Sequence, residues 1–427
     1  MTSVASDRER LRAHPRTGRF GVTAASRRVV LDALARIEGG TLELTLPDGS
    51  TRSFGDGNGP AVGATVHRDD LWRRLARRGR TGLGEAYVAG DWDTDDLAGM
   101  LGLLLRNARA AVQREPLATI ARLGRLRPHV PAPRTMRRAR RDIHYHYDLG
   151  NDLFRLFLDE SMTYSCAYYE HPGQSLADAQ QAKYRRLSEK LALGPDDHVL
   201  EIGCGWGGFA LHAATERGCR VTGLTISEQQ HALARERVAA AGLSDRIEIL
   251  FRDYRTMEGS FSKIVSIEMF EAIGYSQFET FFRTADRLLA PGGSIGLQTI
   301  AIPDQRFDRY RKRPDWIQQY IFPGSLMPSL TAMTRAMTRA STLHVHGLEE
   351  IGIHYADTLK EWRERFDRRS EDALALGYDE RFARIWRYYL ASCEALFRTR
   401  SMRDVQLVLT RQYNESLPAF PSPRLSH

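Results

Sequence analysis

The sequence predicts an α/β fold in which a doubly wound, mainly parallel sheet follows a smaller α+β domain. From about residue 176 onward, short apolar strand patterns alternate with helical patterns, and such alternation builds a parallel sheet with helices on both faces. A glycine-rich turn joins the first of these strands to its helix. Before residue 115 the pattern holds a hairpin and separate helices instead, which indicates a second, smaller unit.

The smaller domain is expected at residues 26–114. Ser26–Ile37 has a helical pattern, and two more helices are expected near Asp69–Arg78 and Leu97–Val112. Thr41–Leu46 and Thr51–Phe54 alternate around a Pro-Asp-Gly turn and predict a β-hairpin. The other predicted divisions are a disordered N-terminus at 1–25, a basic linker at 115–141, the main domain at 142–412 and a tail at 413–427.

The larger domain is predicted from eight segments. The expected strands are His198–Ile202, Arg220–Leu224, Ile247–Phe251, Ile264–Ile267 and Ser294–Thr299. The expected helices are Phe209–Glu216, Glu228–Ala241 and Ser276–Leu289. The last 125 residues are mixed in pattern, and we expect part of them to cover the substrate side of the site.

The turn after the first strand indicates a nucleotide-like cofactor. It reads Gly203-Cys204-Gly205-Trp206-Gly207-Gly208, with Glu201 before it, and glycines let the backbone approach a ligand closely. A nicotinamide site would expect an acid at the end of the second strand, but that strand runs into Thr225 and Ser227. The Pro-Gly-Gly turn at 291–293 is typical of class I methyltransferases. The pattern therefore favours S-adenosylmethionine.

The composition indicates which binding partners and which cellular compartment to expect. Residues 1–141 hold 26 Arg and 15 acidic residues, a net charge of +11, whereas the remainder has a net charge of −3. A one-sided positive field favours an anionic surface such as lipid headgroups, although a merely solvated surface fits the charge as well. The four cysteines are scattered, with no spacing suited to zinc, so no metal is expected. With no long apolar run or secretory signal, a cytoplasmic protein peripheral to the inner membrane surface is predicted.

Several motifs resemble the cyclopropane-fatty-acyl-phospholipid synthase family, which includes the mycolic-acid cyclopropane synthases. The resemblance covers about residues 140–412 and extends more weakly to the family's lipid-binding N-terminal domain. Its motifs begin at His146, Met162, Glu201, Gly223, Arg252 and Tyr320, and the weaker match begins at Gly82.

The resemblance implies which residues hold the cofactor. The implied set is Tyr164, Ser165, Glu201, Gly203, Cys204, Gly205, Trp206, Gly207, Thr225, Ser227, Gln230, Asp253, Tyr254 and Arg255. It also implies that a bound bicarbonate acts as the base, in a site where Cys166, Glu271 and Tyr355 occupy three of the family's positions. Cys393 matches a cysteine assigned as catalytic in the family, but the reaction needs no thiolate nucleophile.

Methylation of an alkene creates a carbocation, which aromatic faces can stabilise where water would destroy it. Candidates within or beside the motifs are Tyr147, Tyr164, Tyr168, Phe270, Tyr320, Phe322 and Tyr355. Each of them alone is more often core packing. The basic cluster just before the His146 motif could dock an anionic lipid surface through Arg134, Arg137, Arg138, Arg140 and Arg141.

The sequence departs from the family pattern around the base. Glu268 replaces a glycine, Ala272 replaces a histidine, and Gln298 stands where the bicarbonate site has histidine. Glutamine cannot carry charge or relay a proton, so bicarbonate binding is in question. Glu268 beside Glu271 could supply the base instead, since paired carboxylates raise each other's proton affinity. Alternatively, Glu268 could pair with an arginine in a purely structural role.

These substitutions resemble the tuberculostearic-acid-type branch, whose members convert an oleoyl chain of a phospholipid to a 10-methylene chain that a partner reductase then saturates. A cyclopropane synthase acting on the same substrate is the alternative. More distant alternatives are a small-molecule methyltransferase and a non-catalytic lipid-binding protein. A nucleic-acid-binding protein is a further alternative, but this sequence has no recognisable nucleic-acid recognition motif. The sequence leaves open whether the chain forms a homo-oligomer.

Overall fold

The computed structural model describes residues 19–112 and 150–418, which belong to two compact units. The smaller unit takes in residues 19–96 and 106–112 of the described chain, and the larger takes in 97–105 and 150–418. The basic cluster at residues 134–141 and the motif residue Tyr147 lie outside the described residues. The roles predicted for them stay predictions.

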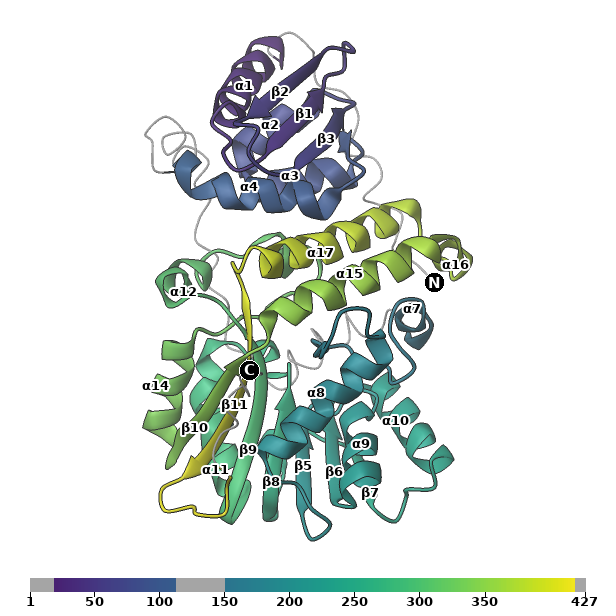
Figure 1. The fold of residues 1–427 in the computed structure, drawn as a ribbon, viewed down its shortest axis with the longest axis vertical. Helices are drawn as coiled ribbons and strands as arrows, with labels where there is room; N and C mark the ends of the chain where they lie inside the picture. Colours follow the sequence, from purple (N-terminus) through teal and green to yellow (C-terminus); the bar gives the residue numbers. More distant parts are fainter. Residues whose placement is uncertain (1–18, 113–149, 419–427) are drawn as a thin grey trace, which may run out of the picture. The chain divides into compact units, whose positions relative to one another are not determined.

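The smaller unit is built on a four-stranded sheet in the order β2-β1-β3-β4 (Figure 1). Strands β1 and β2 form the predicted antiparallel hairpin, whereas β3 pairs parallel with β1 and antiparallel with β4. Helix α1 begins within the segment predicted to be disordered, at Arg19. The elements are α1 (Arg19–Leu34), β1 (Thr41–Thr45), β2 (Thr51–Gly55), β3 (Ala61–Val66), α2 (Asp70–Arg78), α3 (Arg80–Val88) and β4 (Trp92–Asp93). Helix α4 (Leu97–Val112) has residues in both units.

Close packing of α3 on α2 explains a glycine in the weaker family motif. A Cβ on Gly82 would lie 2.1 Å from the carbonyl oxygen of Arg74, so only glycine fits there. The buried carboxylate of Asp91 then binds Arg68 and Arg74, at 2.9 Å each. Two arginines on one buried carboxylate tie the end of α3 to α2.

The larger unit contains a seven-stranded sheet in the order β10-β11-β9-β8-β5-β6-β7. Strands β9, β8, β5, β6 and β7 are parallel, whereas β11 is antiparallel to both of its neighbours. The strands are β5 (His198–Ile202), β6 (Arg220–Thr225), β7 (Ile247–Phe251), β8 (Phe261–Ile267), β9 (Leu289–Ala301), β10 (Leu343–Glu350) and β11 (Arg403–Arg411). This sheet confirms the predicted doubly wound α/β class.

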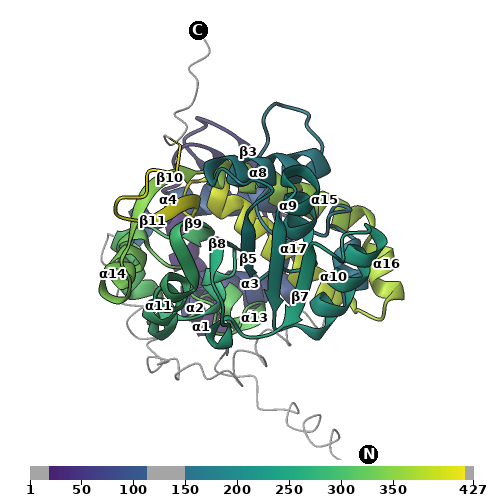
Figure 2. The same cartoon turned by 90° about the horizontal axis from the view of Figure 1, so that it is seen from below.

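Helices cover both faces of this sheet, as the end-on view shows (Figure 2). One face packs against α8 (Leu176–Lys190), α9 (Gly208–Arg217) and α10 (Glu228–Ala240). The other packs against α11 (Phe278–Leu288) and α14 (Leu330–Ala340). Each buried phenylalanine in these layers contributes about 2 kcal/mol of transfer free energy.

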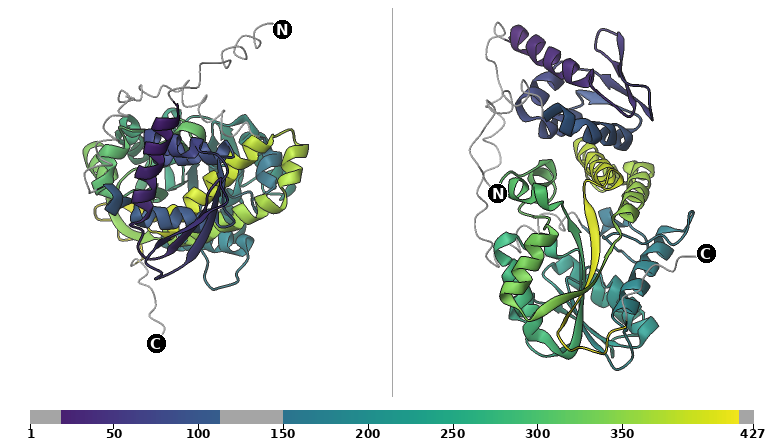
Figure 3. Two further views of the ribbon diagram at one scale, coloured as in Figure 1. Left: turned by 90° about the horizontal axis from the view of Figure 1, so that it is seen from above. Right: turned by 60° about the vertical axis from the view of Figure 1, so that its left-hand side comes forward.

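The remaining segments of the larger unit are helices and single turns. Helices α15 (Gly352–Arg368) and α17 (Glu380–Arg398) pack side by side, and both appear in yellow-green in Figure 3. The shorter helices are α7 (Asn151–Arg155), α12 (Asp304–Tyr310), α13 (Trp316–Tyr320) and α16 (Ser370–Ala375). Three single 3-10 turns are η1 (Tyr254–Thr256), η2 (Phe270–Ala272) and η3 (Tyr275–Gln277). Within residues 19–112 and 150–418, no helix is long and apolar enough to span a bilayer.

Candidate active site

A cavity opens at the carboxyl ends of β5, β6 and β8, where a doubly wound sheet places its ligands. Its lining includes twelve of the predicted cofactor residues, namely Tyr164, Ser165, Glu201, Gly203, Cys204, Gly205, Trp206, Thr225, Gln230, Asp253, Tyr254 and Arg255. Gly207 and Ser227 do not line it. They are the N-cap residues of α9 and α10, and so belong to the turns that lead into these helices.

The turn after β5 adopts a backbone that needs glycine. Gly203 and Gly205 have φ of 87° and 52°, in the left-handed region. A Cβ on Gly203 would lie 2.6 Å from Cγ of Met269, so a side chain there would displace the opposite wall of the cavity. The turn therefore presents bare backbone to a ligand, followed directly by the N-terminus of α9.

Glu201 is the penultimate residue of β5, and its carboxylate is buried. Burial raises its pKa to about 8, and its Oε2 atom has no hydrogen-bond partner among the described residues. A buried acceptor without a partner is costly unless a ligand satisfies it. Because Glu201 lines the cavity, its free oxygen fits a ligand that brings N–H or O–H donors, such as the adenosyl part of S-adenosylmethionine.

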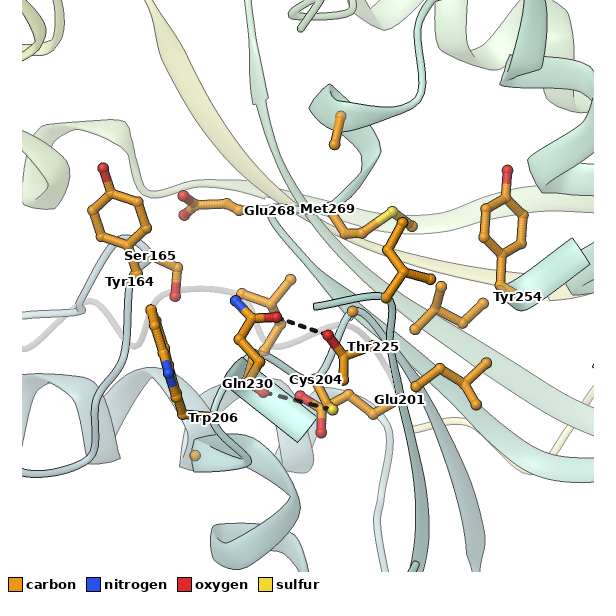
Figure 4. A pocket seen from close by; sticks show the side chains of 18 of the residues that line it. Tyr164, Ser165, Glu201, Cys204, Trp206, Thr225, Gln230, Tyr254, Glu268 and Met269 are labelled. Atoms are coloured by element: carbon orange, nitrogen blue, oxygen red, sulfur yellow. Dashed lines mark hydrogen bonds between the residues drawn. The ribbon is translucent and has the colours of Figure 1, made fainter. Parts of the chain in front are cut away.

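Thr225 and Gln230 form a second polar group on the cavity wall. The Thr225 hydroxyl donates to Oε1 of Gln230 at 2.8 Å and accepts from the backbone N–H of Ser227 at 3.1 Å. Since Oε1 is occupied, the amide nitrogen of Gln230 is the group turned away from Thr225, as Figure 4 shows. It offers the cavity a donor beside Thr225, the last residue of β6, where a nicotinamide site would carry an acid.

The cavity has two chemically different ends (Figure 4). Tyr254 lies at one end, and Asp253 beside it is held in an ion pair with Arg255 at 2.5 Å. Burial raises the pKa of Tyr254, so its hydroxyl stays neutral. Tyr164 and Glu268 lie at the opposite end. An elongated ligand can therefore place an aromatic base at one end and its reacting group at the other.

Ser165 connects the cavity to a buried lysine that the sequence reasoning missed. Lys183 on α8 is fully buried and donates to Oγ of Ser165 at 2.7 Å. Burial lowers the pKa of Lys183 to about 8, while the charge of Glu268 opposes that shift. Because Ser165 accepts from the ammonium, its own proton is available for donation to an anionic ligand group.

The carboxylate of Glu268 lies at the cavity wall and accepts three hydrogen bonds. Oε1 accepts from the backbone N–H of Cys166 at 2.8 Å and from Nε2 of Gln298 at 2.9 Å, and Oε2 accepts from the Tyr355 hydroxyl at 2.6 Å. Burial raises the pKa of Glu268, which these hydrogen bonds partly oppose. The structure thus brings together four of the predicted catalytic residues.

The backbone at Glu268 is strained, with a φ of 50°. A non-glycine residue in this region costs of the order of 1 kcal/mol and persists where the surroundings hold it in place. The position follows β8 directly and lines the cavity. Among the described residues Glu268 forms no ion pair with arginine, so the structural alternative raised from the sequence does not apply.

Glu271 has hydrogen-bond partners of its own, different from those of Glu268. Its Oε1 accepts from the Thr299 hydroxyl at 2.9 Å and from the backbone N–H of Ile300, and it does not line the cavity. Gln298 and Thr299 are successive residues of β9, so their side chains point to opposite faces and hold the two carboxylates apart. Burial, followed by the charge of Glu268, raises the pKa of Glu271 to about 8.

Of the predicted cation-stabilising aromatics that the structure describes, Tyr164 lines the cavity, whereas Tyr168, Phe270, Tyr320, Phe322 and Tyr355 do not. Phe270 is fully buried and packs on Phe278 at 4.5 Å between ring centroids, so it belongs to the core. The ring of Tyr168 lies 4.5 Å from the Arg186 guanidinium, and Phe322 packs on Tyr389.

Tyr320 packs on Trp316 within α13. The aromatic residues that do line the cavity are Tyr164, Tyr184, Trp206 and Tyr254. Of these, Tyr184 was not predicted. It is a buried residue of α8, and nothing in its local pattern separates it from ordinary core packing.

The two candidate cysteines, Cys166 and Cys393, are poorly suited to act as nucleophiles. Burial raises the pKa of both Cys166 and Cys393, which disfavours the thiolate at neutral pH. Cys166 contributes its backbone N–H to Glu268, whereas Cys393 on α17 does not line the cavity. Within the described ranges, no cluster of histidine, cysteine and acidic residues is suited to hold a metal ion.

Known proteins with similar sequences agree with the geometry. The family model for mycolic acid cyclopropane synthetase matches residues 134–407. Tuberculostearic acid methyltransferase UfaA1 of Mycobacterium tuberculosis is 39% identical over 425 residues, which cover 96% of this chain and 97% of that protein. Cyclopropane-fatty-acyl-phospholipid synthase of Escherichia coli K12 is 36% identical over 369 residues, or 85% of this chain and 91% of that protein.

A solved structure is similar as well. The mycolic acid cyclopropane synthase CmaA1, complexed with SAH and CTAB, superposes with a TM-score of 0.59 and is 31% identical. The match covers 66% of this chain and 99% of that chain. The chain therefore shares its fold with a protein whose solved structure contains S-adenosylhomocysteine.

Proposed function

Because this chain belongs to the mycolic acid cyclopropane synthetase family, we propose that it methylates the double bond of an unsaturated acyl chain in a membrane phospholipid and releases a 10-methylene product. The chain is an S-adenosylmethionine-dependent methyltransferase, as its family and fold indicate. The cofactor supplies an electrophilic sulfonium methyl group. The choice of a methylene product over a cyclopropane ring is the part that rests on this chain's own residues.

One observation carries the proposal. The Glu268 carboxylate accepts hydrogen bonds from Cys166, Gln298 and Tyr355, the positions that the family resemblance places around bicarbonate. A carboxylate and a bicarbonate have the same arrangement of two acceptor oxygens. We infer that Glu268 supplies the base that relatives with glycine at this position obtain from solution.

The reaction would then proceed in three steps. The alkene π pair forms a bond to the sulfonium methyl carbon, the carbon–sulfur pair stays on sulfur, and the adjacent chain carbon becomes cationic. A hydride shift moves the cation to the methylated carbon. Glu268 removes a proton from the former methyl carbon, and that carbon–hydrogen pair becomes the exocyclic double bond. The position of Glu268 at the cavity wall, at the opposite end from Tyr254, suits this last step.

The remaining lining residues have supporting roles in the proposal. The Gly203–Gly205 turn, Glu201 and Gln230 would bind the adenosyl part of the cofactor, and Ser165 would donate to its carboxylate. Tyr164, whose hydroxyl is 2.7 Å from that of Tyr389, would present its ring to the cation. This aromatic surface keeps water away from an intermediate that water would trap.

The test is mass spectrometry of the derivatised fatty-acid esters after incubation with S-adenosylmethionine and oleoyl-phosphatidylglycerol vesicles. Ring and exocyclic methylene have the same mass gain but fragment differently after derivatisation. The proposal predicts a methylene. A cyclopropane as the sole product would instead make the protein a cyclopropane synthase, the alternative that its relationship to the Escherichia coli enzyme favours.

A matched pair of variants sharpens the test. Glu268→Gly restores the family residue and opens the carboxylate position, so activity should fall to background and be recovered in part by added bicarbonate. Glu268→Gln keeps the side chain in place and should stay inactive with or without bicarbonate. Equal recovery of both variants, or of neither, would contradict a direct exchange of Glu268 for bicarbonate.

The proposed lipid substrate implies contact with a membrane surface. The net charge of +11 in residues 1–141 would attract anionic headgroups, placing the protein at the inner membrane surface. Binding to anionic vesicles should weaken steeply when salt is raised, because exposed charges are screened beyond ~8 Å at physiological ionic strength. Salt-insensitive sedimentation with vesicles would contradict this. A reductase that saturates the methylene group is the proposed partner for the product.

A further inference from the structure

We propose that Asp404 is the proton partner of Glu268: the two carboxyl groups share one proton, held on Asp404, and the amide of Gln298 bridges them. This inference deepens the proposed function and rests on it, because it concerns the state in which Glu268 acts as base. Asp404 acts through Glu268, so it is a positioning residue.

The fold places the two carboxyl groups on either side of Gln298. Glu268 directly follows β8, Gln298 is on β9 and Asp404 is on β11, and these strands are neighbours in the sheet. Nε2 of Gln298 donates to Oε1 of Glu268 at 2.9 Å and to Oδ2 of Asp404 at 3.0 Å. Both carboxyl groups therefore surround one amide nitrogen.

The orientation of this amide is fixed from the far side. Lys190 can only donate, and it does so to Oε1 of Gln406 at 2.5 Å. The nitrogen of Gln406 must then donate to Oε1 of Gln298, at 3.0 Å. That leaves the nitrogen of Gln298 facing the two carboxyl groups. The ammonium of Lys190 thus sets the direction of the whole chain of hydrogen bonds.

The backbone also holds Asp404 tightly. Its carbonyl accepts from the N–H of Ile351 at 2.8 Å. A Cβ on the next residue, Gly352, would lie 2.7 Å from the backbone nitrogen of Asp404, so α15 begins in direct contact with β11. Because α15 also carries Tyr355, one close approach positions both partners of Glu268.

The donor count decides which group carries the charge. Glu268 accepts from the Cys166 backbone, Gln298 and Tyr355, whereas Asp404 accepts from Gln298 and has only the weak thiol donor of Cys166 and the carboxyl group of Glu268 as further side-chain partners. Oδ1 of Asp404 is buried with no partner among the described residues. An ion is stabilised where its lone pairs are satisfied, so the negative charge belongs on Glu268 and the proton on Asp404.

The charges around the pair support one proton. Lys183 from α8 is the cation that faces it, and the Cys166 thiol and the Tyr355 hydroxyl face it as neutral groups. Glu271 adds a further acid from η2. Two ionised carboxylates in this buried place would exceed the compensation that one lysine offers. Burial and the charge of Glu268 accordingly raise the pKa of Asp404.

The first experiment is infrared spectroscopy of the full-length protein in which aspartate is labelled with carbon-13 at its side-chain carboxyl. The expected result is a label-shifted band of a protonated carboxyl group at pH 7 that is lost in Asp404→Asn. Glu201, Glu271 and Glu268 do not carry the label and so cannot produce the band. Absence of the band from the labelled wild type would overturn the proposal, whatever the reaction product proves to be.

The second experiment is the pH dependence of kcat in Asp404→Asn and Asp404→Leu. Asparagine keeps a weaker donor for Glu268, so the acid limb should move to higher pH by less than about one unit, and leucine should move it by about 1–2 units. If Asp404 were ionised, asparagine would remove a like charge and move the limb to lower pH, which would overturn the proposal.

Unchanged binding of S-adenosylhomocysteine would show that each variant is folded. The failure of the proposed function would appear separately, as a cyclopropane product from the wild-type enzyme with the infrared band intact.

Discussion

Tyr355 donates a 2.6 Å hydrogen bond from its hydroxyl to Oε2 of Glu268, a residue 87 positions earlier in the chain. Burial raises the pKa of the tyrosine, so it stays a neutral donor. The bond favours the ionised form of Glu268 and lowers a pKa that burial raises. Tyr355 therefore favours the unprotonated form of the proposed base.

Tyr355→Phe should lower kcat at pH 7 by about tenfold, because losing a hydrogen bond to a charged group costs about 1.5 kcal/mol or more. With the donor gone, the pKa of Glu268 rises, so the acid limb of the kcat profile should move to higher pH. Tyr378→Phe is the matched control, since its ring stacks on Phe382 away from the cavity. An unchanged acid limb in Tyr355→Phe would contradict this role.

Cys393→Ser should keep kcat within about twofold of the wild type. The thiol does not line the cavity, and its burial disfavours the thiolate that a nucleophile would need. The measurement is methyl transfer from labelled S-adenosylmethionine, together with a binding assay for S-adenosylhomocysteine to confirm folding. A large fall in kcat with cofactor affinity preserved would assign to Cys393 the catalytic role that the structure does not support.

Glu201→Gln should weaken S-adenosylhomocysteine binding by about tenfold or more, because the unpartnered acceptor oxygen gives way to an amide nitrogen that can only donate. Titration calorimetry measures this directly, independent of the lipid substrate. Glu216→Gln, an exposed residue of α9 in the same unit, is the control. Equal affinities of the Glu201 and Glu216 variants would mean that the free oxygen of Glu201 does not face the cofactor.

The parallel part of the fold could be predicted because its signals are local. β5 and β7 have the predicted bounds, and the glycine turn after β5 occupies the predicted place. The antiparallel strands β10 and β11 could not be predicted in the same way. Their pairing joins segments far apart in the chain, and such pairing leaves no periodic signal of its own.

The same limit applies to the site. Cofactor residues could be predicted because they follow consecutive strands, whose carboxyl ends meet. Asp404 and Lys183 could not, since a single aspartate in a strand and a single lysine in a helix look like ordinary surface residues. Only the adjacency of β11 to β9, and the packing of α8 on the sheet, bring them to Glu268.

Lys183 provides a test in which stability and activity should change in opposite directions. The buried ammonium has its pKa lowered from 10.5 to about 8, so the folded state disfavours the charged form. The sign follows from linkage: the destabilisation is fully present below pH 8, and it fades as the pH rises toward 10.5. It amounts to about 3 kcal/mol at neutral pH as an order of magnitude.

Lys183→Met should therefore raise the free energy of unfolding at pH 7, and the gain should shrink when both proteins are unfolded at pH 10. The same variant removes the cation that faces Glu268 and Asp404, so the pKa of Glu268 rises and kcat at pH 7 falls. Lys360→Met, at an exposed position of α15, controls for the substitution itself. A variant that lost both stability and activity would show that Lys183 holds the local fold together. Gained stability with lost activity would instead identify a charge that the fold tolerates because the reaction requires it.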